Sequence, residues 1–228
     1  MLRFIISLII LTVSSGIVFP QSGKFLPSQV KIGTDLSYIG ASILSKEKTQ
    51  REYNADIDFN RFIVTMDYGT GTWNINDPDF DYDNSGTYFR MGVDYNFTKP
   101  SADNNAIYIG ARYAISGFTE NFTYRVDDPF YGAYEHQLNG IDRNGSWIEF
   151  VTGMKVRIWK GLFLGWTGRL KFASSVSSGP ATFNTYWMPG FGKTNKDSQW
   201  GLNYQIYYRI PLFRKKFKPE EILEAPEE

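Results

Sequence analysis

The sequence contains no cysteine and only one histidine, His136. Without cysteine there is no disulfide, no thiolate nucleophile, no Cys-ligated metal site and no lipidated cysteine of a bacterial lipoprotein. Acidic and basic residues number 24 each, so no positive field draws nucleic acid to the chain. Beyond the first 20 residues, no apolar run approaches the roughly 18 residues of a membrane helix. We therefore expect no nucleic-acid partner, no cofactor and no helical membrane domain.

The first residues have the pattern of an export signal. Arg3 precedes an apolar stretch over residues 4–13, and small residues follow at 14–16. An uncleaved membrane anchor is the alternative, which the shortness of the stretch disfavours. We predict a signal peptide over 1–22, one domain over 23–211 and a charged periplasmic tail over 212–228.

The body of the chain alternates between polar and apolar residues with a period of two, which is typical of strands. Between Glu52 and Asn60, for example, one face is acidic or amide and the other is aromatic or aliphatic. The expected strands lie near residues 30–43, 51–59, 62–69, 87–97, 106–116, 147–158, 162–174 and 199–210. Short connections at 60–61, 98–105 and 160–161 alternate with long ones at 70–86, 117–146 and 175–198, and 44–50 is intermediate. This pattern predicts an all-β fold: a transmembrane, antiparallel, up-and-down β-barrel of about eight strands in the bacterial outer membrane, with both termini periplasmic.

Aromatic residues end the apolar faces of these strands and enclose aliphatic positions. Two such belts match the two interfaces of a bilayer, so we expect the apolar face to contact outer-membrane lipids. A soluble β-sandwich or lipocalin-like barrel is the alternative, and it would have the apolar face inside and the polar face toward water. The expected girdle residues are Tyr53, Phe59, Phe62, Tyr68, Phe89, Tyr95, Trp166, Phe172, Trp200 and Tyr208.

The residues that alternate with this apolar face point to the other side of each strand, and many of them are charged. We therefore expect charged residues inside the barrel. Acids come from the first strands and most bases from the later ones, so they can pair across a narrow lumen. A salt-bridged plug is the preferred interpretation, and a selective path for ions or small solutes is the alternative. The expected lumen charges are Asp35, Glu52, Asp56, Asp58, Asp67, Arg90, Asp94, Arg112, Lys155, Arg157, Arg169, Lys171 and Arg209.

Motifs for catalysis or metal binding are weak. His136 lies in an expected loop with no surrounding motif, so a lipid-modifying enzyme using it with a loop serine is only a third alternative. The acids between Asp77 and Asp83 resemble a calcium loop, but Asn84 and Arg90 stand where an EF-hand needs glycine and glutamate. We predict no enzyme activity, no catalytic residue and no metal site.

Four stretches resemble an uncharacterised family of outer-membrane β-barrel proteins from Bacteroidota, a domain of unknown function with a small barrel like those of OmpA and OmpX. They are Tyr88–Asn96, Ile109–Tyr113, Pro189–Gly192 and Tyr207–Pro211. The resemblance implies a fold and a location but no activity.

Many aromatic residues lie in the expected long loops, where they either pack into a cap over the barrel or bind a partner. We therefore predict a structural or partner-binding role in the envelope. The partner would be another envelope protein, contacted through the extracellular loops or the C-terminal tail.

Overall fold

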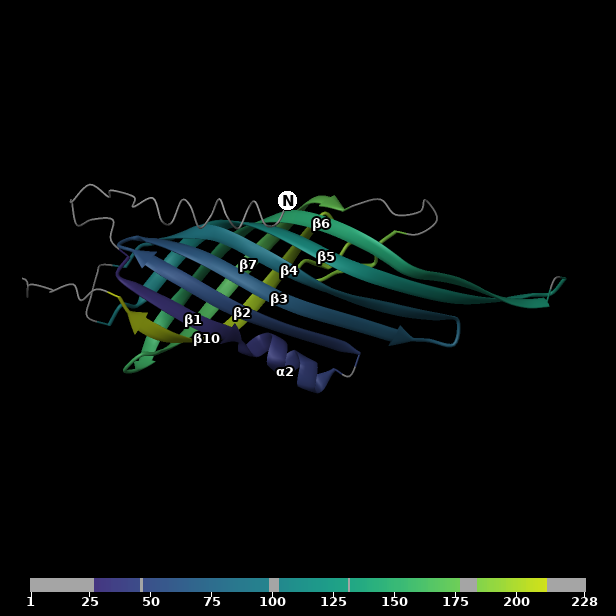
Figure 1. Ribbon diagram of the computed structural model, residues 1–228, viewed down its shortest axis with the longest axis horizontal. Helices are drawn as coiled ribbons and strands as arrows, with labels where there is room; N and C mark the ends of the chain where they lie inside the picture. Colours follow the sequence, from purple (N-terminus) through teal and green to yellow (C-terminus); the bar gives the residue numbers. More distant parts are fainter. Residues whose placement is uncertain (1–26, 46, 99–102, 131, 177–183, 213–228) are drawn as a thin grey trace, which may run out of the picture.

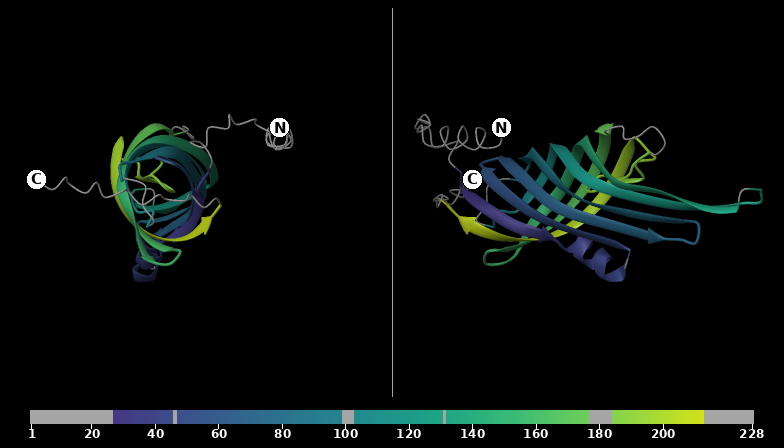
Figure 2. Two further views of the ribbon diagram at one scale, coloured as in Figure 1. Left: turned by 90° about the vertical axis from the view of Figure 1, so that its left-hand side faces the viewer. Right: turned by 45° about the vertical axis from the view of Figure 1, so that its right-hand side comes forward.

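The computed structural model describes residues 27–45, 47–98, 103–130, 132–176 and 184–212. Eight antiparallel strands form a closed barrel in the order β1-β10-β7-β6-β5-β4-β3-β2. Figure 2 shows the closed ring in the view along the barrel. The predicted fold, an up-and-down antiparallel barrel of eight strands, is confirmed. The predicted signal peptide and nearly all of the predicted tail lie outside the described residues.

The strands differ greatly in length. The barrel strands are β1 (Gln29–Asp35), β2 (Lys48–Phe59), β3 (Phe62–Asn76), β4 (Phe80–Asn96), β5 (Ala106–Asp128), β6 (Gly132–Trp159), β7 (Leu162–Val176) and β10 (Ser198–Pro211). Gln29 pairs with Pro211, so both ends of the barrel segment lie beside the short turns at 60–61 and 160–161. We call this end the turn end and the opposite end the mouth.

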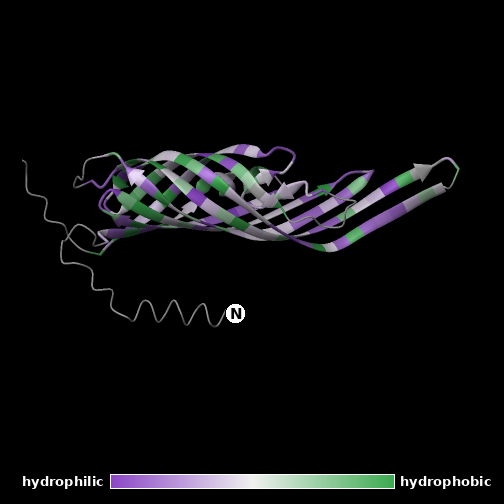
Figure 3. Ribbon diagram, turned by 90° about the horizontal axis from the view of Figure 1, so that it is seen from above, coloured by the Kyte–Doolittle hydropathy of each residue, from purple (hydrophilic) through white to green (hydrophobic). Residues whose placement is uncertain are grey.

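Alternating burial along the strands gives the barrel two different faces. On β2, for example, Glu52, Asn54 and Asp56 are buried in the interior, whereas Tyr53 is exposed on the outer wall. Figure 3 shows hydrophobic and hydrophilic positions alternating along the barrel strands. Because successive side chains of a strand point to opposite faces, a closed barrel separates them into an interior and an exterior.

A short helix, α2 (Leu36–Leu44), replaces the second half of the first expected strand. The prediction of a strand over 36–43 is wrong. Asp35 caps the helix by accepting a hydrogen bond from the Tyr38 N–H at 3.0 Å, and Leu36, Ile39 and Ile43 follow helical rather than strand spacing. No helix within the described ranges is long and apolar enough to cross a bilayer.

Beyond the end of β1, this helix lies along the barrel wall beside β2 and β10 (Figure 1). The Ser37 hydroxyl accepts a hydrogen bond from the Tyr204 N–H at 2.6 Å, and the Ser42 hydroxyl accepts one from the Gln50 N–H at 2.8 Å. These side-chain contacts satisfy backbone groups that β1 no longer reaches, so a serine-bearing helix completes the wall there.

Two of the expected long loops are strands instead. β3 and β4 continue to a connection at 77–79, and β5 and β6 continue to one at 129–131. The predictions of loops at 70–86 and 117–146 are therefore wrong. In these segments aromatic residues alternate with polar ones, as Phe122 and Tyr124 do with Thr123 and Arg125, but aliphatic residues are scarce, so the segments resemble aromatic-rich loops. The β5–β6 extension, residues 118–142, projects far from the barrel (Figure 1), and we call it the outer hairpin.

The third expected loop turns back into the mouth. Its described part contains β8 (Trp187–Met188) and β9 (Gly192–Lys193), a pair of two-residue strands. Trp187, Met188 and Phe191 are buried there rather than displayed on the surface. We call residues 184–194 the capping segment, and its aromatic residues form a cap, one of the two alternatives expected from the sequence.

Candidate functional site

Charged side chains from opposite walls meet inside the barrel. Following β2 from the turn end, Asp58 pairs with Lys31 at 2.8 Å and Asp56 pairs with Lys155 at 2.5 Å. Farther along, Glu52 pairs with Arg90 and with Arg169. Strands β2 and β6 are opposite each other in the ring, so the Lys155–Asp56 pair crosses the whole lumen.

The centre of the lumen holds two arginines shared among three acids. Arg90 contacts Glu149 at 3.2 Å and Asp67 at 3.3 Å, besides Glu52. Arg169 contacts Glu149 at 3.0 Å, and Asp67 and Glu52 at 3.4 Å each. All five side chains are buried. We call Glu52, Asp67, Arg90, Glu149 and Arg169 the central cluster. Such multiple pairing satisfies charges that would be very costly to bury alone.

Two further groups extend this cluster toward the turn end and toward α2. Arg112 contacts Asp67 at 2.7 Å and Asp94 at 3.1 Å. Asp35 accepts a hydrogen bond from the Asn203 amide at 2.5 Å while it caps α2. Polar contacts therefore run from Asp94 through the central cluster to Asp35 at the helix, while the Lys155–Asp56 and Lys31–Asp58 pairs lie separately nearer the turn end.

Three expected lumen residues lie outside the ion-paired centre. Arg157 is half-buried and pairs with Asp103 near the turn end. Arg209 is half-buried, with its guanidinium 5.9 Å from the centroid of the Phe163 ring. Lys171 is buried but donates to the backbone carbonyls of Gly190 at 2.7 Å and Phe191 at 3.2 Å. That lysine joins the capping segment to the barrel wall.

Sequence reasoning missed four charged members of the interior. Lys31 is an even number of residues from Asp35, and Glu149 from Lys155, so each lies on the same strand face as an expected lumen residue. The period-two alternation alone could therefore have found both. The buried pair Arg143–Glu120, 2.7 Å apart, lies on segments expected to be loops. The alternation of apolar and polar residues after Phe118 was the signal that could have placed this pair on strands.

An aromatic layer separates the central cluster from the mouth. The Tyr88 hydroxyl donates to Glu52 at 2.6 Å, and the Trp147 indole N–H donates to Glu149 at 2.7 Å. Phe191 of the capping segment packs edge-on against Trp147, with ring centroids 5.9 Å apart. Gly190 has φ +81° and lies against the Tyr88 ring, where a side chain would not fit. The lumen is thus filled by ion pairs and covered by rings.

The outer wall is apolar between aromatic residues. Tyr53, Tyr68 and Phe89 lie side by side on β2, β3 and β4 toward the mouth, and Phe59, Phe62 and Tyr95 do the same toward the turn end. Trp166 lies beside Met154 and Tyr204. The remaining expected girdle residues, Phe172, Trp200 and Tyr208, are exposed on the outer wall. Between the belts are exposed aliphatic residues such as Val93 and Met66.

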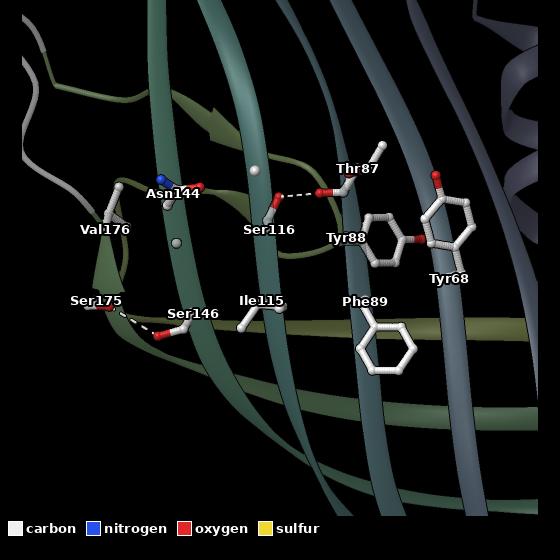
Figure 4. Close-up of a pocket in the computed structure, with 12 residues that line it drawn as sticks. Tyr68, Thr87, Tyr88, Phe89, Ile115, Ser116, Asn144, Ser146, Ser175 and Val176 are labelled. Carbon is white, nitrogen blue, oxygen red and sulfur yellow. Dashed lines mark hydrogen bonds between the residues drawn. The ribbon is translucent and has the colours of Figure 1, made fainter. Parts of the chain in front are cut away.

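A cavity of about 530 Å³ opens across β3 to β7 toward the mouth (Figure 4). Small residues form much of its lining. The Ser116 hydroxyl donates a hydrogen bond to the Thr87 carbonyl at 3.0 Å, and the hydroxyl oxygens of Ser146 and Ser175 are hydrogen-bonded to each other at 3.0 Å. Tyr68, Phe89 and Ile115 border it on the side of the belt. None of the described residues that line this cavity is charged.

The candidate chemical motifs are not assembled into sites in the described part of the chain. The His136 ring stacks near Tyr124, with centroids 5.2 Å apart, and no described serine hydroxyl contacts it. Asp81 pairs with Arg125, while Asn84 donates to the Trp187 carbonyl at 2.8 Å. No group of three potential metal ligands occurs among the described residues. Neither catalysis by His136 nor a calcium loop has geometric support there.

A closed barrel with an apolar outer wall, aromatic belts and an ion-paired interior defines the class of membrane-spanning β-barrels. Within that class, the chain belongs to the family described as Domain of unknown function (DUF6048), whose model matches residues 1–215. Among solved structures, it is similar to the crystal structure of Neisserial surface protein A (NspA). Sequence identity is 13% and the TM-score is 0.41, over 81% of this chain and 95% of that chain. No curated protein matches the chain.

Proposed function

We propose that this protein is a non-conducting outer-membrane barrel that binds another envelope component through its outer hairpin. The filled lumen is the observation that carries the proposal, because it leaves the surfaces outside the membrane as the places where function resides. The resemblance to barrel proteins of Bacteroidota supports an outer-membrane location. Short turns at one end and long extensions at the other support periplasmic termini and an extracellular hairpin.

The outer hairpin has a strand edge suited to binding an extended segment. β6 pairs with both β5 and β7 up to Gly145, but from Gly132 to Asn144 it pairs only with β5 among the described residues. An unpaired edge presents a row of backbone donors and acceptors, to which a strand of another chain can add. Tyr134, which is exposed on this edge strand, would supply side-chain contact.

The filled lumen predicts that the purified barrel passes no steady current in planar bilayers. Buried pairs such as Lys155–Asp56 span the interior, and an eight-stranded barrel is only wide enough for its own side chains. The measurement is single-channel recording at several salt concentrations. Steady, ion-selective openings in the wild-type protein would contradict the proposal and favour the transport alternative.

The proposed partner can be sought with a photo-crosslinking residue at position 137 on the β6 edge, which is exposed. We expect one dominant adduct with an envelope protein in native membranes. A crosslinker at Lys160, exposed at the opposite turn, provides the matched control and should not yield that adduct. If position 137 gives only uncrosslinked monomer, partner binding through the outer hairpin is wrong.

A further inference from the structure

Two lysines converge on the aromatic residues of the mouth, beyond the membrane-facing wall. Lys48, at the start of β2, has its ammonium 5.5 Å from the Trp73 ring centroid and 5.1 Å from that of Trp187. Lys193, in β9, has its ammonium 5.7 Å from the Trp73 centroid and 5.3 Å from that of Tyr186. The two cations therefore share one indole ring, on which each makes a cation–π contact.

No carboxylate balances this pair among the described residues. The ion pairs formed there include neither Lys48 nor Lys193, whereas the nearby Arg143 is paired with Glu120. Burial and the charge of Lys193 both lower the pKa of Lys48. Two neighbouring cations without an acid form a site with unsatisfied positive charge, which an anion would stabilise.

Among the described residues, an unpartnered donor is carried by the Trp187 ring, which the Lys48 ammonium contacts. Trp187 is fully buried, and its indole N–H has no hydrogen-bond partner in the described part of the chain. Gly71 makes room for this ring, because a Cβ there would lie 2.7 Å from the indole. A buried donor without an acceptor is costly, and a ligand oxygen would satisfy it.

An apolar pocket adjoins the lysines. It has a volume of about 330 Å³ and is lined by Ile75, Phe80, Tyr82, Phe122, Asn184 and Tyr186. Tyr186 links the two features, since it forms part of the pocket and also lies 5.3 Å from the Trp73 ring centroid. An apolar pocket beside a few polar groups is typical of small-molecule sites.

We propose that the mouth binds a phosphate monoester, with the phosphate at Lys48, Lys193 and the Trp187 N–H and the organic group in the pocket of Phe80, Phe122 and Tyr186. A phosphate dianion matches two lysines in charge and offers several acceptor oxygens, whereas a carboxylate would neutralise only one of them. This site does not depend on partner binding by the outer hairpin.

The test uses the full-length barrel in detergent at pH 7.5, with tryptophan fluorescence as the readout because Trp73 and Trp187 lie at the site. The probes are phenyl phosphate, inorganic phosphate and phenol. We expect saturable binding of phenyl phosphate, weaker binding of inorganic phosphate and no binding of phenol. Lys48→Gln and Lys193→Gln should each weaken phenyl phosphate binding about tenfold or more. Lys196→Gln, an exposed lysine close in sequence, should leave it unchanged.

Each variant is first shown to be folded by the difference in its gel migration between unheated and heated samples. Binding is compared only after that. Absence of saturable binding of phenyl phosphate up to about 10 mM would overturn the proposal. Equal binding by the wild type and the Lys48→Gln, Lys193→Gln double variant would also overturn it. Vesicles with and without phosphatidic acid distinguish a lipid source. A fluorescence response to phosphatidic acid in vesicles, with no response to soluble phenyl phosphate, would mean that the site is not the proposed one.

Discussion

Replacing Arg90 with methionine is expected to lower the free energy of unfolding by about 3–5 kcal/mol. Arg90 contacts Glu52, Asp67 and Glu149 in the central cluster, and its side chain is fully buried. Without it, three acids share Arg169 and Arg112 in an interior that water does not readily reach. Methionine keeps much of the volume, so the expected loss comes from charge rather than from a cavity.

The measurement is urea unfolding of the barrel refolded in lipid vesicles, followed by tryptophan fluorescence. Arg125→Met is the matched control, because Arg125 also pairs with an acid, Asp81, but its side chain is 42% exposed on the outer hairpin. An exposed pair contributes at most about 1 kcal/mol. Equal and small losses in both variants would show that the lumen is hydrated and that the interior is not a plug.

A double-mutant cycle on Lys155 and Asp56 separates pairing from simple loss of packing. This is the most isolated of the cross-lumen ion pairs, with 2.5 Å between nitrogen and oxygen. Each single change, Lys155→Met or Asp56→Leu, leaves its former partner buried and unpaired, so the double variant should lose less stability than the two single losses together.

Much of the fold could be predicted because a barrel repeats one local rule. Alternation with a period of two assigns each side chain to the wall or to the lumen, and this is why Asp56, Asp67 and Arg169 could be placed from sequence. The rule fails at Leu36, where the N-cap Asp35 and helical spacing replace it. In the extensions beyond the belts the alternation continues, but aromatic rather than aliphatic residues carry it, and such residues are equally common in binding loops.

The partners inside the lumen could not be predicted in the same way. Lys155 and Asp56 are 99 positions apart, and their contact depends on how the ring closes rather than on any local pattern. The capping segment depends on small residues in distant strands: Gly71 makes room for Trp187, and Gly145 makes room for Met188. Such complementarity between segments has no signature in either segment alone.

Introducing arginine at Val93 is expected to cost about 2–4 kcal/mol, the range for a charged residue near the bilayer midplane. Val93 is 48% exposed on the outer wall of β4, between Val64 of β3 and Ala111 of β5. If that wall faces lipid, the new guanidinium has neither water nor an acid near it. Water and lipid headgroups can then hydrate it only if the bilayer is distorted locally, which costs free energy.

The matched control for this change is Tyr134→Arg, because Tyr134 is 51% exposed on the outer hairpin and stands clear of the apolar wall. A surface substitution there should change stability by no more than about 0.5 kcal/mol. Both variants are unfolded by urea in vesicles of the same lipid. In a soluble barrel, Val93 would be an exposed surface position facing water, and arginine would be tolerated there as well as at Tyr134. A large loss at Val93 with little loss at Tyr134 therefore requires an apolar solvent around the barrel wall, and equal small losses would mean that the wall does not contact lipid.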